Sequence, residues 1–168
     1  MESQIREERA GDEEAIRRVH REAFDGDLEA RLVDLLRARG RVVTSLVALA
    51  EGNIVGHVLL SRVTIDGHSA IKALGLAPVS VLPQYQRTGI GSRLINDALT
   101  ICGRDGNEIV VLVGEPKYYR RFGFRPAKPF GLDNEYGAND EFMAFELRPG
   151  SLDGIRGLVR YAPEFAEV

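Results

Sequence analysis

A short glycine-rich turn carries the residues in this sequence best suited to chemistry. Gly89 and Gly91 flank Ile90, where the apolar run of residues 75–82 gives way to a helical pattern. Glycine allows left-handed backbone angles and lets another molecule approach the main chain closely. The start of a helix also leaves several N–H groups without partners and concentrates partial positive charge. The turn therefore predicts an anion site suited to a phosphate or diphosphate group.

Arg87 and Arg93 flank the turn, and an arginine can hold a phosphate through two parallel hydrogen bonds. A plain strand-to-helix turn, whose glycines only relieve crowding, remains an alternative, because short glycine motifs are weak signals. The dinucleotide fingerprint is excluded because Leu94 stands where its third glycine would be. The P-loop is excluded as well, since no Gly-Lys-Ser/Thr run is present.

The composition is that of an ordinary soluble globular protein. The chain has 168 residues, of which 44% are hydrophobic and 28% charged, enough for one domain with a substantial core. No apolar run approaches the roughly 20 residues that cross a bilayer, and the first residues lack a signal-peptide pattern. We therefore expect a cytoplasmic protein. A formal net charge of −3 argues against general binding to nucleic acid or to a membrane surface.

Apolar periodicity and turn residues predict a mixed order of strands and helices. Asp12 and Asp27 are suitable N-caps for two helices, and the single cysteine, Cys102, falls on the apolar face of the helix that begins at Ile90. Pro78 lies within a predicted strand, which indicates a bulge or kink there. The expected strands are 4–9, 42–50, 54–65, 71–82, 108–113 and 141–147; the expected helices are 12–24, 27–39, 90–102 and 116–123; a surface loop is expected over 126–140 and a further extended segment over 158–161.

The turn resembles a motif of a known enzyme superfamily. Gln86-x-x-Gly89-x-Gly91, after the strand that ends in residues 79–81, is similar to the coenzyme A loop of the GNAT superfamily of N-acetyltransferases. In that superfamily the strand before the loop is splayed from its neighbour, and the pantetheine arm enters the gap. The resemblance implies acetyl-CoA as co-substrate, in contact with Val79, Ser80, Val81, Gln86, Arg87, Thr88, Gly89, Ile90, Gly91, Ser92 and Tyr118.

The resemblance continues downstream at a tyrosine. Tyr119, followed four residues later by Gly123-Phe124, matches the position of the family's general acid, which protonates the departing thiolate. A phenol with a pKa near 10 is a reasonable donor for that step. Two alternatives stay open: Tyr119 could only pack against the sheet, and Tyr118 could be a core residue or a substrate contact.

The residues that would stabilise the oxyanion and remove the amine's proton are less well marked. Main-chain N–H groups near residues 79–81 are candidate oxyanion donors. Glu22, with His20 nearby, is a candidate catalytic base in the region where the family builds its acceptor site. A solvated helix face is the alternative reading of these charges. His57 could be a core residue, and we expect His68 to be exposed. No His/Cys/Asp cluster has metal-ligand spacing, and N–H groups can bind a diphosphate without Mg²⁺.

Together these observations predict one α/β domain over residues 1–168, with 148–168 as a C-terminal extension. We expect a mixed, mostly antiparallel sheet that has helices on both faces and is open between the fourth and fifth strands. The expected activity is direct transfer of an acetyl group from acetyl-CoA to a primary amine. That amine could belong to a small molecule, an antibiotic, an amino acid or a peptide. A non-catalytic acyl-CoA-binding or regulatory domain and a transferase for a longer acyl-CoA are the alternatives. Whether the chain forms a homodimer is open.

Overall fold

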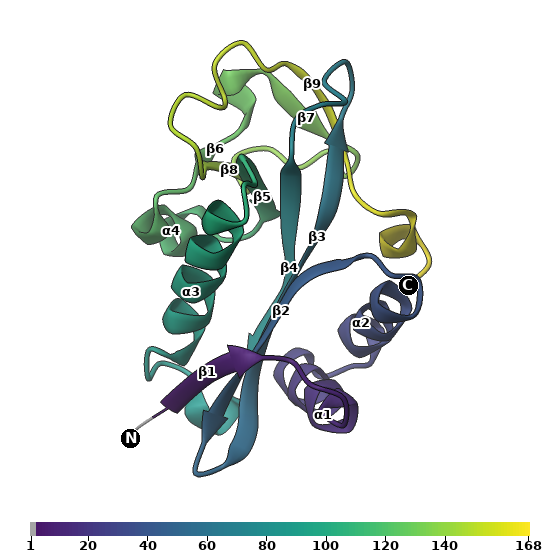
Figure 1. The fold of residues 1–168 in the computed structure, drawn as a ribbon, viewed down its shortest axis with the longest axis vertical. Coiled ribbons are helices and arrows are strands. Elements are labelled where there is room, and N and C mark those ends of the chain that lie inside the picture. Colours follow the sequence, from purple (N-terminus) through teal and green to yellow (C-terminus); the bar gives the residue numbers. More distant parts are fainter. Residues whose placement is uncertain (1–2) are drawn as a thin grey trace. The chain divides into compact units, whose positions relative to one another are not determined.

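Two groups of secondary-structure elements make up the protein in a computed structural model that describes residues 3–168 (Figure 1). Internal contacts divide the chain into two compact units. The first contains residues up to 61 together with 77–98 and 163–168, and the second contains residues 62–76 and 99–162. Strand β3 (Asn53–Ile65), strand β4 (Ala73–Val81) and helix α3 (Ile90–Arg104) each have residues in both units.

The first unit is built on strands in the order β1-β2-β3-β4, in which β2 pairs antiparallel with both β1 and β3. These strands are β1 (Ser3–Glu7), β2 (Val42–Ala50), β3 (Asn53–Ile65) and β4 (Ala73–Val81), the last two with only part of their length in this unit. Ile5 pairs with Ala48, and Leu46 pairs with Val58. Glu51, at φ 53°, and Gly52, at φ 80°, form the tight turn between β2 and β3. The hairpin expected over these residues is confirmed.

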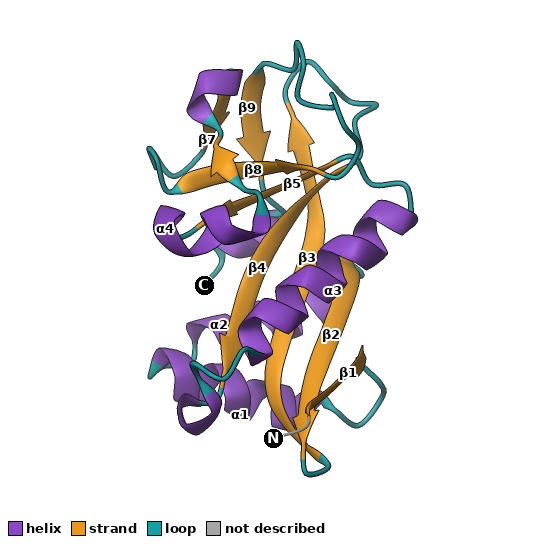
Figure 2. Ribbon diagram, turned by 90° about the vertical axis from the view of Figure 1, so that its left-hand side faces the viewer, coloured by secondary structure: helices purple, strands orange, loops and turns teal. Residues whose placement is uncertain are grey.

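Helices cover both faces of this sheet (Figure 2). Alternation along β3 decides which helix meets which face, since neighbouring residues of a strand point to opposite sides. Gly56 faces α3 (Ile90–Arg104), where an added Cβ would lie 3.0 Å from Leu94 Cδ1. His57, the next residue, faces α1 (Glu13–Phe24) and hydrogen-bonds to His20. Helix α2 (Leu28–Ala38) packs beside α1.

The two aspartates expected to cap α1 and α2 bind arginines instead. Neither Asp12 nor Asp27 makes a side-chain cap hydrogen bond. Asp12 accepts hydrogen bonds from the Arg6 guanidinium and the Arg9 amide, while Asp27 accepts one from Arg21. Both aspartates hold the predicted N-cap positions, but their carboxylates bind these arginines and not the helix amides.

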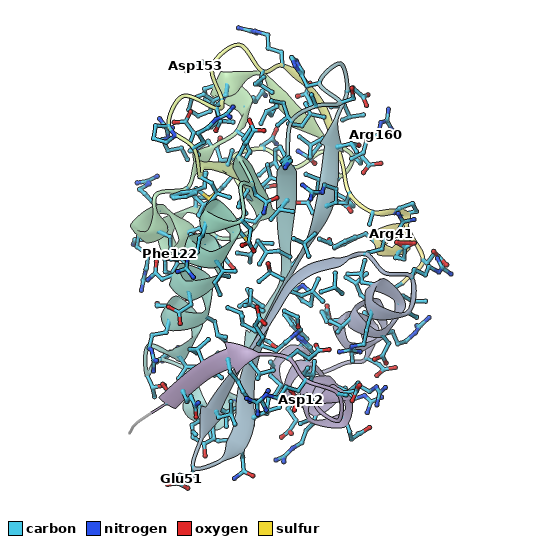
Figure 3. The ribbon with its side chains drawn as sticks, viewed as in Figure 1. Asp12, Arg41, Glu51, Phe122, Asp153 and Arg160 are labelled. Atoms are coloured by element: carbon cyan, nitrogen blue, oxygen red, sulfur yellow. The ribbon has the colours of Figure 1, made fainter. Side chains whose placement is uncertain are left out.

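The last residues of the chain belong to the first unit. Glu164, with 1% of its side chain exposed, accepts hydrogen bonds from Arg39 at 3.1 Å and from Arg41 at 2.8 Å. Arg41 is labelled in Figure 3. Two cations around one buried carboxylate compensate its lost hydration. These bonds fasten the C-terminal 3₁₀ turn, Pro163–Ala166, to the segment that follows α2.

The second unit contains a mixed sheet in the order β4-β5-β8-β6. Its further elements are β5 (Ile109–Val113), α4 (Pro116–Tyr119), β6 (Arg125–Pro126), β7 (Leu132–Asn134), β8 (Phe142–Glu146) and β9 (Gly157–Arg160). β5 runs parallel to β4 and antiparallel to β8. β9 pairs with the end of β3 and with β7. The expected mixed, mostly antiparallel sheet is confirmed.

β4 and β5 pair over three residues only. The register runs from Ala73 opposite Ile109 to Gly75 opposite Val111, and between the described residues of these strands no pair follows. The peptide bond between Ala77 and Pro78 is cis, two residues beyond the last pair. The sheet was expected to be open between its fourth and fifth strands, and within residues 3–168 β4 and β5 pair only from Ala73 to Gly75 of β4.

The segment 126–140, expected as a surface loop, contains ordered elements. Lys128–Phe130 forms a 3₁₀ turn, and β7 follows it and pairs in parallel with β9 at Leu132↔Gly157. The expectation of a loop was wrong here because a three-residue strand leaves no alternation to read in the sequence.

Candidate active site

The loop between β4 and α3 has a fixed shape. A 3₁₀ turn, Pro83–Tyr85, follows β4. The side-chain amide of Gln86 donates to the Val81 carbonyl at 2.9 Å, and the Thr88 hydroxyl donates to the Tyr85 carbonyl at 2.6 Å. The motif glutamine therefore points back to the end of β4 and holds the loop against it.

The main-chain N–H groups of residues 87–92 are available to a ligand. Arg87 has φ 63° and Gly89 has φ 89°, both in the left-handed region. A Cβ added at Gly89 would meet nothing within 4 Å, so the space over this residue is open. Within the described part of the chain, residues 3–168, no oxygen accepts a hydrogen bond from these six amides. A helix start with unpaired amides and open space in front fits a diphosphate.

The two arginines beside the loop differ. The Arg87 side chain is exposed and has no polar partner among residues 3–168, so its charge is available to an anion. The Arg93 guanidinium instead donates to the Ser3 carbonyl at 2.7 Å and to the Ser3 hydroxyl. Arg93 thus fastens β1 to α3 through one guanidinium nitrogen, whereas the Arg87 guanidinium makes no such contact with any described residue.

The end of β4 presents alternating side chains. Val79 is half-buried, whereas Ser80 and Val81 are buried. The Ser80 hydroxyl points to α1 and lies 2.7 Å from His20 Nδ1. Because neighbouring residues of a strand point to opposite faces of the sheet, the Val79 side chain lies on the face away from α1.

Tyr118 and Tyr119 lie in α4 of the second unit. Tyr119 packs edge-on against Tyr118 and Phe124, with ring centroids 5.0 and 6.0 Å away. Only a glycine fits at position 114, since an added Cβ there would collide with the Tyr119 ring. Burial, and then the neighbouring Tyr118, raise the pKa of Tyr119 to about 12. Tyr118 stacks with the Arg121 guanidinium at 4.6 Å.

Glu22 lies on the exposed side of α1. Its carboxylate accepts a hydrogen bond from Arg18 Nε at 2.6 Å, one helical turn away. The side chain also lines a pocket of about 480 Å³ in the first unit, with both acidic and basic neighbours. The residues around this pocket are Glu14, Ala15, Arg18, Arg21, Glu22, Asn53 and Ile54.

Comparison with known proteins places the chain in a family. The sequence model described as "Acetyltransferase (GNAT) domain" matches residues 4–127. The chain belongs to the GNAT acetyltransferase family. YhbS of Escherichia coli strain K12, named an uncharacterized N-acetyltransferase, is 34% identical over 147 residues, which cover 86% of this chain and 87% of YhbS.

Solved structures confirm the expected GNAT fold. The crystal structure of YhbS from Escherichia coli in complex with CoA matches 98% of this chain and 92% of that chain, with a TM-score of 0.93 and 32% identity. A GNAT family acetyltransferase from Brucella melitensis in complex with acetyl-CoA matches 98% of both chains, with a TM-score of 0.83 and 36% identity. The expectation of an acetyltransferase of this family is confirmed.

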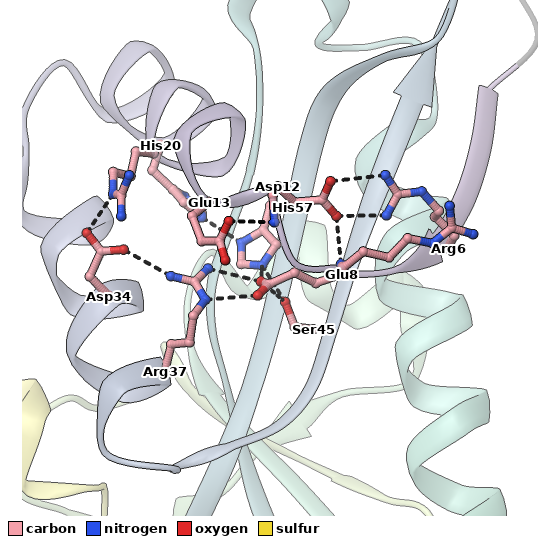
Figure 4. Close-up of polar contacts among 12 residues, drawn as sticks. Arg6, Glu8, Asp12, Glu13, His20, Asp34, Arg37, Ser45 and His57 are labelled. Atoms are coloured by element: carbon pink, nitrogen blue, oxygen red, sulfur yellow. Dashed lines mark hydrogen bonds and ion pairs between the residues drawn. The ribbon is translucent and has the colours of Figure 1, made fainter.

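This GNAT chain also contains a buried polar cluster beside β4 (Figure 4). His20 and His57 are fully buried and hydrogen-bonded to each other at 2.7 Å. His57 also contacts Ser45 at 2.7 Å, and Ser45 donates to Glu8 at 2.8 Å. The expectation of a core position for His57 is confirmed, whereas His20 lies in the interior and not on the helix face that carries Glu22.

Sequence reasoning missed Ser45, Glu8 and Arg37 as members of this cluster. Polar residues inside otherwise apolar strands, at positions 45, 57 and 80, were the available signal. Two further findings concern residues 3–168: no three His, Cys, Asp or Glu side chains there form a group that could hold a metal ion, and no helix there is both long and apolar enough to cross a bilayer.

Substitution of Gln86 tests the shape of the GNAT loop. Gln86→Ala removes one partly buried hydrogen bond, which contributes about 1 kcal/mol net, so affinity for acetyl-CoA should fall about fivefold. Gln84→Ala is the matched control, because Gln84 is exposed in the same turn and has no hydrogen-bond partner among residues 3–168. Calorimetric titration of both variants measures the effect, and equal affinities would show that Gln86 does not shape the site.

Proposed function

We propose that the protein transfers the acetyl group of acetyl-CoA directly to a primary amine. The observation that carries this proposal is the set of unpaired amides of residues 87–92 at the start of α3, beside the open space over Gly89. The crystallised YhbS contains CoA and the Brucella melitensis relative contains acetyl-CoA, which supports the same ligand class for this chain.

Different residues of the loop bind different parts of the coenzyme. The amides of Arg87, Thr88, Gly89, Ile90, Gly91 and Ser92 hold the diphosphate, with the Arg87 guanidinium adding a full charge. Gln86 acts through the loop, because its side chain bonds to the Val81 carbonyl. The main chain of residues 79–81 supports the pantetheine arm and donates to the carbonyl oxygen as it gains charge. Tyr118 provides a further coenzyme contact.

Acetyl-CoA supplies an activated thioester, and the protein holds it beside the amine. Proximity alone can supply several kcal/mol of a barrier of this kind, on the order of 7 to 11 in well-oriented reactions. No nucleophilic side chain of the protein is needed, because the amine nitrogen itself bonds to the carbonyl carbon as the carbon–sulfur bond breaks.

Tyr119 is the proposed proton donor, by its place in the family motif. Its pKa, raised to about 12, keeps the hydroxyl protonated at neutral pH. The raised pKa also makes the Tyr119 hydroxyl a weaker acid than a tyrosine hydroxyl in water. We therefore assign it a hydrogen bond to the departing sulfur, with the proton following as the sulfur gains charge. Glu22 is proposed to attract the cationic amine through its exposed carboxylate.

The acceptor class proposed is a small-molecule amine or the amino group of a peptide. We propose that residues 1–168 act as one cytoplasmic domain with 148–168 as its C-terminal extension, whether as a monomer or a homodimer. YhbS and the Brucella melitensis relative both carry acetyltransferase names, which gives no support to a non-catalytic acyl-CoA-binding domain.

A turnover assay with defined amines tests this function. The protein is mixed with acetyl-CoA and, separately, tyramine, spermidine, kanamycin, lysine and a lysine-containing peptide, and release of the CoA thiol is followed. Turnover with at least one amine, and a mass gain of one acetyl group on it, is the expected result. Tight binding of acetyl-CoA without turnover of any amine would favour the non-catalytic alternative. Faster turnover of hexanoyl-CoA than of acetyl-CoA would favour the longer acyl donor.

A further inference from the structure

A continuous line of hydrogen bonds crosses the interior of the first unit from β4 to a carboxylate near the surface. Ser80 Oγ lies 2.7 Å from His20 Nδ1, and His20 Nε2 lies 2.7 Å from His57 Nδ1. His57 Nε2 lies 2.7 Å from Ser45 Oγ, which donates to Glu8 Oε1 at 2.8 Å. Each group in this line is positioned by a different element, so five segments must meet to build it.

Both histidines in the line are neutral at physiological pH. Burial, and then the positive charge of Arg37, lower the pKa of His20 to about 4. Burial, His20 and Arg37 lower the pKa of His57 well below its ordinary value. The charged groups nearby are Arg37 from α2 and Glu8, which follows β1; these two form an ion pair at 2.8 Å. Phe24, from α1, stacks on the His20 ring.

The hydrogen bonds allow only one arrangement of protons. An ionised carboxylate can only accept hydrogen bonds, so the Ser45 hydroxyl donates its single hydrogen to Glu8. The Ser45 oxygen must therefore accept a hydrogen bond from His57 Nε2–H. A neutral His57 then offers Nδ1 as an acceptor, which requires His20 to donate through Nε2–H.

His20, neutral in turn, accepts at Nδ1 from the Ser80 hydroxyl. Every donor therefore points from Ser80 toward Glu8, and the Ser80 oxygen keeps lone pairs for a donor on its other side. Ser80 is 7% exposed, whereas the two imidazoles have no exposed surface.

We propose that these residues form a proton relay that removes a proton from the acceptor amine at Ser80 and delivers it to Glu8. This inference rests on the proposed function, because it places the amine beside the same β4 residues that support the thioester. It supplies the base that Glu22, paired with Arg18 on the helix surface, does not provide. Ser80 is the residue that touches substrate, and His20, His57 and Ser45 act through it.

The relay balances when each proton moves across one hydrogen bond. The ammonium gives a proton to Ser80 Oγ, which passes its own to His20 Nδ1. His20 Nε2–H then passes to His57 Nδ1, His57 Nε2–H to Ser45 Oγ, and the Ser45 proton to Glu8. The net change is ammonium to amine and carboxylate to carboxylic acid, with both imidazoles neutral before and after. Glu8 has 16% of its side chain exposed and returns the proton to water.

Nitrogen NMR of the histidine rings tests the proton order without any acceptor. With ¹⁵N-labelled protein, both His20 and His57 should be neutral Nε2–H tautomers from pH 5.5 to 8.5. An Nδ1–H tautomer or an imidazolium at either residue in this range would overturn the relay. Calorimetric binding of acetyl-CoA by the same sample reports on the proposed function separately, so the two ideas can fail independently.

Kinetics with the fastest amine from the panel test the use of the relay. Ser80→Ala and Glu8→Gln should lower kcat at pH 7 by about 100-fold or more, the usual contribution of a positioned base, with KM for acetyl-CoA unchanged. The loss should shrink as the pH approaches the pKa of the amine, because the free amine is then already neutral. With hydroxylamine, a far weaker base, the loss should stay below about threefold.

Two variants control for structural damage. Ser80→Thr keeps the hydroxyl and should retain most of the wild-type kcat. Ser61→Ala removes another buried hydroxyl, one without a partner among residues 3–168, and should change nothing. An equal loss in Ser80→Ala at every pH and with both nucleophiles would show a purely structural role, and no loss at all would equally overturn the relay.

Discussion

Replacement of Gly89 by valine is expected to weaken acetyl-CoA binding by about 30-fold or more, since loss of one amide hydrogen bond to a charged phosphate costs on the order of 1.5 to 3 kcal/mol. Gly89 has φ 89°, and the space over it is open. A valine would both strain the turn and place methyl groups where the diphosphate must meet the amides of residues 87–92. The measurement is the dissociation constant for acetyl-CoA by calorimetry.

Gly52→Val is the matched control for this variant. Gly52 has φ 80° and also faces open space, but it lies in the turn between β2 and β3. It should therefore suffer a similar loss of thermal stability with unchanged affinity for acetyl-CoA. Equal weakening of binding by both substitutions would mean that strain, and not contact with the ligand, explains the effect at Gly89.

Tyr119→Phe is expected to lower kcat by about 100-fold or more, the usual contribution of a positioned acid, while the dissociation constant for acetyl-CoA stays within about twofold. The substitution removes only the hydroxyl, so the ring packing against Phe124 and Tyr118 is kept. Comparison of kcat with directly measured binding separates the two effects. A variant with wild-type kcat would show that Tyr119 only packs.

The pH dependence gives a second test of Tyr119. The donor must be protonated, and its raised pKa of about 12 means that the donor form persists throughout the range from pH 6 to 10. Wild-type kcat should therefore show no decline caused by Tyr119 below about pH 11. A decline of kcat near pH 10 that is absent from the Tyr119→Phe variant would contradict a raised pKa for Tyr119.

The sequence predicts well those features that arise from neighbours along the chain. The glycines of the turn and the apolar face of α3 lie within a few residues of each other, so local spacing is enough to predict the turn at the start of α3. The hairpin between β2 and β3 is predictable for the same reason, because Glu51 and Gly52 mark its turn. Family resemblance adds the identity of the ligand, which spacing alone does not give.

Features that depend on distant partners leave no such local pattern. Arg93 has the position of an anion ligand in the sequence, but the fold brings Ser3 beside it as a partner. His20 has the helical spacing of the apolar face of α1, four residues after Ile16, but only the fold shows that β3 brings His57 against it. The relay forms only when three strands pair in the observed register and α1 turns His20 toward them. No short stretch of sequence predicts either condition.

The amides of residues 87–92 are proposed to hold the diphosphate of the coenzyme. Amide NMR of the protein titrated with CoA, and with S-acetylpantetheine as a matched ligand that lacks the diphosphate, tests it most directly. We predict that CoA moves the amide signals of these residues more than those elsewhere in residues 3–168, and that S-acetylpantetheine leaves them unchanged. Saturable CoA binding with those six signals unmoved would contradict the account.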